Sequence, residues 1–251
     1  MKKILTSLVT VATMATVSNA DLARVEMGMG VFSQTPTGTI SYSDLGLTGT
    51  YASNKNKTNN MYVWLLIKHP VPALPNLRLE YTSISDSGPI SGNFGDFSIT
   101  TGSTSAANIT MGQFDIIPYY NILDNTFWAT LDLGLDIKIA QTDYSISPIT
   151  NLTGTPKSLL LPVPLLYARA RSEVPATNIA FESDVKFITY GKSTIYDIRV
   201  KADYTLDFIP VIQPALEVGY RIQKFDLTSS DSKSKMNLDF SGIYVGLMAR
   251  F

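Results

Sequence analysis

The sequence predicts an all-β fold, a transmembrane antiparallel up-and-down β-barrel of about ten strands, with eight or twelve strands as alternatives. Three observations predict it. A pattern typical of a signal peptide opens the chain, apolar and polar residues then alternate along many long stretches, and the last strand ends on an aromatic residue. We take these in chain order.

The first twenty residues have the three parts of a secretory signal peptide. Lys2 and Lys3 give a positive start, an uncharged and mostly apolar stretch follows at 4–17, and the small residues Ser18 and Ala20 suit a signal-peptidase site. We therefore expect cleavage after Ala20, with 1–20 a signal peptide and 21–251 the barrel domain. A membrane anchor is the alternative, but the apolar stretch is shorter than the ~20 residues of a spanning helix.

After residue 20 the repeating signal has period two, which is the period of a strand and not of a helix. In 127–139 every second residue is apolar, and the residues between them include Asp132, Asp136 and Lys138. The stretch 194–206 alternates in the same way, with Asp197, Arg199, Lys201 and Asp203 on one face. Strands of soluble proteins usually have ~5–6 residues, whereas a tilted strand that crosses a bilayer needs ~9–11. These alternating stretches exceed the longer figure. Their length favours strands that cross a bilayer, with the apolar face toward lipid and the charged face toward a lumen.

Ten strands are expected, at 24–33, 60–68, 76–85, 108–120, 127–140, 163–174, 178–190, 193–206, 213–225 and 238–251. Short connections alternate with longer polar ones, as they must when the two rims of a barrel face different compartments. The tight turn at 191–192 departs from this alternation. A further short hairpin near 38–42 is an alternative that would change the strand count.

The C-terminal strand ends in a pattern of its own. Alternate apolar positions lead to the terminal aromatic residue: Ile243, Val245, Leu247, Ala249 and Phe251. This ending resembles the strand that the outer-membrane assembly machinery recognises, so we expect it to be the assembly signal.

The chain resembles an uncharacterised family of Gram-negative outer-membrane β-barrel proteins. The most specific segment is the proline-rich turn and strand at 69–81, and further similarity lies at 119–125, 131–135, 165–170 and 217–221. The resemblance covers roughly residues 60 to 251. It implies an outer-membrane barrel, distantly OmpW-like or porin-like in fold, and brings no activity with it.

Composition excludes several function classes. The chain has no cysteine, so it has no disulfide, thiol nucleophile or thiolate metal site, and its net charge of −1 gives no basic footprint for nucleic acid. Its one histidine, His69, lies beside Pro70 in a short turn, where a turn role is a better interpretation than a general base. We therefore predict no catalytic residue, no cofactor and no metal site.

Charged residues at inward strand positions are the candidate functional set. Acidic pairs such as Asp132 with Asp136, or Glu182 with Asp184, could hold a cation or share a proton. Because basic residues occupy comparable positions, a structural ion network that fills a narrow lumen is the favoured interpretation, and conduction or ligand binding is the alternative. The candidate lumen-lining charges are Arg78, Glu80, Asp132, Asp136, Lys138, Arg169, Arg171, Glu182, Asp184, Lys186, Asp197, Arg199, Lys201, Asp203, Glu217 and Arg221.

Aromatic residues near two short turns suit the ring of side chains that meets lipid headgroups. These are Tyr119, Tyr120, Phe127, Trp128, Tyr204 and Phe208. The polar loops 88–107 and 227–235 lack apolar anchors, so we expect them to be flexible and solvated.

The sequence thus predicts a non-enzymatic outer-membrane barrel with a plugged or narrow lumen, in an envelope-structural or surface-interaction role. A narrow channel for ions or small polar solutes is the alternative, and a soluble periplasmic β-protein is a third class. The expected partners are outer-membrane lipid, lipopolysaccharide and the assembly machinery, with both chain termini in the periplasm.

Overall fold

The computed structural model describes residues 23–71, 73–100, 102–103, 105–126, 128–156, 158–206 and 212–251. The predicted signal peptide with Ala20, the two aromatic residues Phe127 and Phe208, and the short turn at 207–210 lie outside the described residues.

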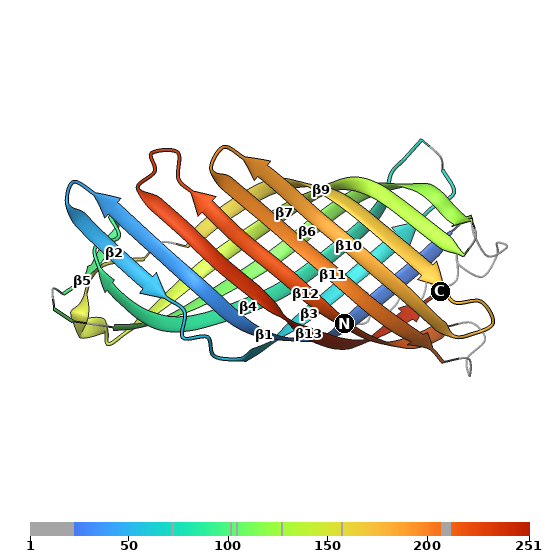
Figure 1. Cartoon of the computed structure of the whole chain (residues 1–251), viewed down its shortest axis with the longest axis horizontal. Coiled ribbons are helices and arrows are strands. Elements are labelled where there is room, and N and C mark those ends of the chain that lie inside the picture. The colour runs from blue at the N-terminus through green and yellow to red at the C-terminus, as the bar shows by residue number, and fades with distance from the viewer. Residues whose placement is uncertain are drawn as a thin grey trace, which may run out of the picture.

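Ten antiparallel strands form a closed barrel (Figure 1), which confirms the predicted fold class and strand number. The last strand pairs with the first over seventeen residue pairs, from Glu26 with Arg250 to Tyr42 with Ser234, and this pairing closes the cylinder. The barrel strands are β1 (Arg24–Asp44), β3 (Thr58–Lys68), β4 (Asn76–Gly92), β6 (Ser105–Thr126), β7 (Ala129–Ser147), β9 (Leu159–Glu173), β10 (Ile179–Tyr190), β11 (Ser193–Thr205), β12 (Gln213–Thr228) and β13 (Ser234–Arg250).

An extra strand, β2 (Leu47–Ala52), extends one wall beyond the barrel. Strand β1 pairs with β3 along its first half and with β2 along its second half, where Thr39 lies opposite Ala52. The hairpin suspected near residues 38–42 therefore exists. It lengthens β1 and leaves the barrel at ten strands, because β2 takes over the pairing of β1 where β3 has ended.

The two ends of the barrel differ. The end that carries the β1–β2 hairpin, β5 (Phe97–Ile99), the 3-10 helix η2 (Ile149–Asn151) and β8 (Leu152–Gly154) is called the loop end. The end with the short connections β3–β4, β6–β7 and β9–β10 is called the turn end, and the C-terminus lies toward it (Figure 1). No helix among the described residues is long and apolar enough to cross a membrane.

Several strands extend further toward the loop end than predicted. Strand β4 runs to Gly92 instead of residue 85, and β7 runs to Ser147 instead of residue 140. The expectation that 88–107 is solvated and without apolar anchors was wrong, since Ile90 and Ile99 are 3% exposed and belong to the apolar core. The reason is pairing: β4 continues beside β6 as far as Ile90 opposite Ser105, which turns its alternate side chains inward.

The alternation sorts the side chains onto two faces, and the apolar face is the outer one. Large apolar side chains cover the outside of the barrel wall, including Met29, Val63, Leu135, Phe181, Val200, Val218, Val245 and Leu247, each 47% to 61% exposed. The buried interior carries most of the charges. A soluble barrel has the reverse arrangement, whereas a barrel in lipid requires this one.

One expected member of the aromatic ring was wrong. Tyr119 is 2% exposed and points into the barrel, where its ring centroid lies 6.4 Å from that of Tyr167. Its neighbour Tyr120 is 47% exposed on the outside. Successive residues of a strand point to opposite faces, so both could not have faced lipid. Trp128 and Tyr204 are exposed, as a headgroup ring requires.

The charged interior as the candidate functional site

All the candidate lumen charges named above are buried inside the barrel, none more than 7% exposed. Sequence reasoning missed three further charges that belong with them, Glu26, Asp115 and Arg250. The alternation could have found Asp115 and Arg250, since each lies two residues from another inward position, Gln113 and Met248 respectively. Glu26 lies in the strand with the weakest pattern.

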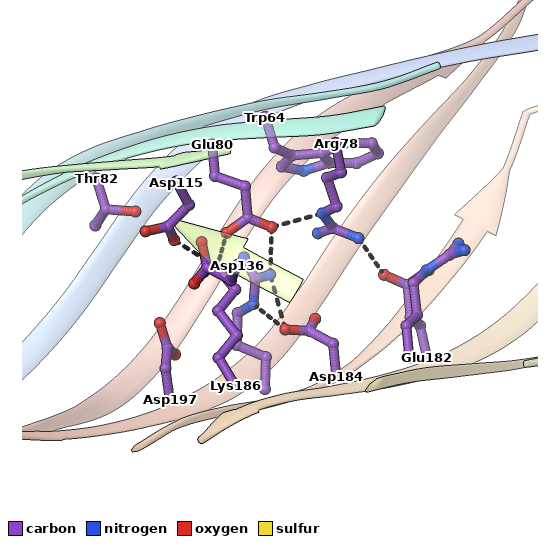
Figure 2. A network of polar contacts seen from close by, with 12 residues as sticks. Trp64, Arg78, Glu80, Thr82, Asp115, Asp136, Glu182, Asp184, Lys186 and Asp197 are labelled. Atoms are coloured by element: carbon purple, nitrogen blue, oxygen red, sulfur yellow. Dashed lines mark hydrogen bonds and ion pairs between the residues drawn. The ribbon is translucent and has the colours of Figure 1, made fainter. Parts of the chain in front are cut away.

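The middle of the interior is a continuous set of ion pairs between opposite walls, which Figure 2 shows. The Lys186 ammonium on β10 donates to a Glu80 oxygen on β4 at 2.6 Å and to an Asp115 oxygen on β6 at 2.5 Å. Arg199 of β11 donates to Glu80 at 2.5 Å and to Asp184 at 2.8 Å. The pairs that Glu80 and Asp115 form with Lys186 and Arg199 therefore connect strands that are not neighbours in the barrel wall, whereas Arg199 and Asp184 belong to the neighbouring strands β11 and β10.

Toward the loop end the ion pairs give way to neutral amide side chains. Arg221 holds Asp197 with its Nε and Nη2 atoms, at 2.9 and 2.6 Å to the two carboxylate oxygens. The amide of Gln223 also donates to Asp197 and reaches across the lumen to the amide oxygen of Gln113 at 2.6 Å. Beyond these two amides many inward side chains are apolar, among them Met111, Phe225 and Leu238, while Asp86 and Thr142 are buried polar exceptions.

Toward the turn end a second group of arginines neutralises the acidic residues. Arg169 bridges Asp132 and Glu182, with N–O distances of 2.6 and 2.7 Å. Asp203 accepts from Arg171 at 2.6 Å and from Arg250 at 2.5 Å. Of the acidic pairs proposed as cation or proton sites, Asp132, Glu182 and Asp184 thus each accept from an arginine. Within the described residues no group of three or more metal-ligating side chains is arranged to hold an ion.

Asp136 is the exception in the network. It is fully buried, its nearest cation is the Lys186 ammonium at 4.0 Å, and neither of its carboxylate oxygens has a hydrogen-bond partner among the described residues. Its neighbours Glu80 and Asp115 already accept from Lys186. The network thus contains one acidic group that its cations do not satisfy.

Aromatic side chains support one wall of the network. The Tyr62 hydroxyl and the Trp64 indole both donate to Glu217, at 2.7 and 3.2 Å, and the Lys201 ammonium lies 4.7 Å from the Trp64 ring centroid. Glycines on the next strands leave room for these rings: a Cβ on Gly28 would collide with the Trp64 ring. Gly28 and Trp64 together keep Glu217 in place.

Gly28→Ala is expected to destabilise the barrel by about 1–3 kcal/mol, the usual cost of overpacking a filled interior. The added methyl group displaces the Trp64 ring from Glu217, so tryptophan emission should shift to the red as the barrel loosens. Gly112→Ala is the matched control, because its Cβ would meet no atom closer than 3.4 Å. Urea unfolding followed by fluorescence checks both variants, and equal midpoints would contradict the packing role of Gly28.

His69 lies in the turn between β3 and β4, as predicted. Its Nδ1 accepts from the Val71 backbone N–H at 3.2 Å, and its Nε2 contacts the Pro75 carbonyl oxygen at 3.0 Å. Both ring nitrogens therefore stabilise the turn. His69 therefore lies at the turn end of the barrel, far from the loop end.

A closed barrel with an apolar outer surface and an ion-paired interior defines this protein as a transmembrane β-barrel of the outer-membrane class. Its outward apolar residues meet lipid and its charges satisfy one another inside. No family model matches the chain, and no curated protein sequence matches it.

Solved structures with a similar arrangement of strands come from Gram-negative barrels. The translocator domain of the autotransporter NalP from Neisseria meningitidis has 13% identity and a TM-score of 0.42, over 100% of this chain and 95% of that one. A FadL homologue of Pseudomonas aeruginosa has 9% identity and a TM-score of 0.29, over 96% and 92% of the two chains. The OccK5 protein of the same organism has 7% identity and a TM-score of 0.23, over 91% and 98%. Similarity this low conveys no function.

Proposed function

We propose that this chain is a non-enzymatic outer-membrane protein with a closed lumen, which serves the structure or the surface interactions of the envelope. Its loop end faces the outside and both termini lie in the periplasm, because long loops of bacterial barrels are extracellular and short turns periplasmic. The supporting observation is the filled interior, in which paired charges from opposite walls meet at the centre.

The spaces left within the network argue against a passage. The cavity beside Trp64 and Arg199 has a volume of about 10 Å³, and the one between Glu26 and Arg169 about 20 Å³. A single water molecule needs roughly 10–15 Å³ measured in this way, so each space holds one water at most. A hydrated ion would have to break several buried ion pairs to pass.

The chemistry of the described interior also supports a non-enzymatic role. The one histidine is held by backbone groups of a turn, and the acidic side chains of the ion network other than Asp136 face arginine, lysine, tyrosine or tryptophan donors. An acid or base in catalysis needs a group that is free to exchange a proton with a substrate. Asp136 lines neither of the two small cavities described above.

The refolded protein is expected to be electrically silent in a planar bilayer. Insertion is verified in the same preparation by the heat-dependent electrophoretic mobility of folded barrels, and a known porin provides the positive control for fusion. Discrete, reproducible current steps would contradict the closed lumen and favour the narrow channel. Neutralising Lys201 or Arg199 would then be expected to change ion selectivity.

A further inference from the structure

A sizeable cavity lies at the loop end, outside the ion network. Its volume is about 530 Å³, within the range of about 300–1,000 Å³ that small-molecule sites occupy. Inward side chains of several barrel strands and of β2 form its wall, including Ile40, Tyr51, Ile90, Ile109, Leu227 and Met236. We call it the loop-end cavity.

Two stacked aromatic rings form one side of this cavity. Phe94 and Phe97 lie nearly parallel, with ring centroids 5.0 Å apart and an interplanar angle of 9°. A tight turn holds them: the Phe94 N–H donates to the Phe97 carbonyl at 2.9 Å, and Gly95 between them has a φ of +87°, which favours glycine. The Tyr42 ring packs beside Gly95, where a Cβ would lie 3.1 Å from the Tyr42 hydroxyl.

The floor of the loop-end cavity is apolar on three strands. On β6, β12 and β13 the inward residue next to the cavity is Ile109, Leu227 or Met236, and the following one toward the network is again apolar: Met111, Phe225 or Leu238. Each of these three floor residues is 3% exposed or less. On these strands a molecule in the cavity is therefore separated from the ion network, and its way out is at the loop end; on β4 the buried carboxylate of Asp86 lies opposite Ile109.

The edge of the cavity opens to solvent and carries polar groups. Asp96 and Ser234 are exposed, and the Tyr144 and Ser229 side chains also line the space. Lys235 contributes to the edge from an outward position, since the adjacent Met236 is the buried one. The edge carries one acidic and one basic side chain, so it has no net charge to attract an ion, and the apolar wall would strip a charged ligand of its water. The hydroxyl groups can hold a neutral polar group by hydrogen bonds.

We propose that the loop-end cavity binds one small, uncharged, apolar molecule that carries a hydroxyl or similar hydrogen-bonding group. An apolar cavity of about 150 Å³ accommodates benzene, so the space here accepts a molecule of two or more rings or an equivalent chain. The stacked phenylalanines favour an aromatic or flat ligand. This inference deepens the proposed function, since it gives the surface interaction a ligand class, and it rests on that function for its outward orientation.

The test uses the full barrel in lipid nanodiscs with N-phenyl-1-naphthylamine, an uncharged probe whose fluorescence rises in apolar surroundings. We expect saturable binding, weakened at least tenfold in Ile90→Arg and in Phe97→Asp. Phe97 lies in β5 outside the barrel wall, so that variant tests the cavity without risk to barrel folding. Leu45→Arg, at the 98% exposed tip of the β1–β2 hairpin, is the control and should bind as the unmodified protein does, with the same lipid background.

Competition tests the ligand class. Neutral 2-naphthol is expected to displace the probe at a concentration at least tenfold lower than 2-naphthoate, because the carboxylate would lose its water against an apolar wall. Equal probe signals in all four proteins would overturn the cavity as a binding site, and equal competition would overturn the uncharged class. Neither result depends on conduction, so current steps in a planar bilayer would contradict the closed lumen and leave the binding data intact.

Discussion

Lys186→Met is expected to lower the free energy of unfolding by about 3–5 kcal/mol, the cost of removing one partner from a buried ion pair. The Lys186 ammonium is the donor shared by Glu80 and Asp115, from two different strands of the opposite wall. Methionine fills a similar volume without the charge. The loss of unfolding free energy therefore measures the cost of leaving the Glu80 and Asp115 carboxylates without this cation. Urea unfolding of the refolded protein, followed by tryptophan fluorescence, measures the change.

Two matched variants sharpen this expectation. Lys192→Met changes an exposed lysine in the β10–β11 turn and should alter stability by less than about 0.5 kcal/mol. Asp136→Ala removes a buried carboxylate that accepts no hydrogen bond, so it should be neutral or stabilising. An Asp136→Ala loss as large as that of Lys186→Met would mean that the network depends on summed charge and not on the individual hydrogen bonds.

Val200→Arg is expected to destabilise the barrel by about 2–4 kcal/mol in a lipid bilayer, the cost of a lipid-facing arginine near the midplane. Val200 lies within β11 and is 53% exposed on the outer face, between Ser183 and Tyr220 of the neighbouring strands. In water an arginine at such an exposed position would cost almost nothing. The variant therefore separates a membrane barrel from a soluble one by a stability measurement alone.

Leu45→Arg provides the control for this experiment too. Leu45 is more exposed than Val200 but lies at the tip of the β1–β2 hairpin, beyond the barrel wall. Unfolding in liposomes should give the unmodified midpoint for Leu45→Arg and a lower midpoint for Val200→Arg. Equal midpoints for the two variants would support the soluble periplasmic class.

The sequence predicted the barrel strands well because one physical requirement governs most of their length. Lipid on one face and a crowded lumen on the other impose alternation, so β10 and β11 begin and end within one residue of the expected bounds. At the loop end lipid and lumen no longer impose this alternation. There β4 and β7 continue for seven residues past the predicted ends, supported by pairing with β6 that no local pattern announces.

The candidate charges could be placed on the inward face from alternation, but their partners could not. Alternation gives Asp132 and Asp136 the same face, yet one accepts from Arg169 at 2.6 Å and the other from no group. Pairing across the lumen depends on the tilt and stagger of the strands, which no single strand encodes. The loop-end cavity was missed for a related reason, since it is formed by residues from many strands that are each unremarkable in sequence.

The cross-lumen pairs also have a consequence for how the barrel assembles. The Lys186–Glu80 bond joins residues 106 positions apart in the chain, and the Tyr62–Glu217 bond joins residues 155 positions apart. Contacts of such sequence separation form late, because the loop-closure entropy must be overcome before they contribute. Pairs between neighbouring strands, such as Arg199 with Asp184, can form in the open sheet, whereas the cross-lumen partners meet only when β13 meets β1. Reopening the seam requires these cross-lumen charges to be separated, which makes the closed barrel slow to unfold.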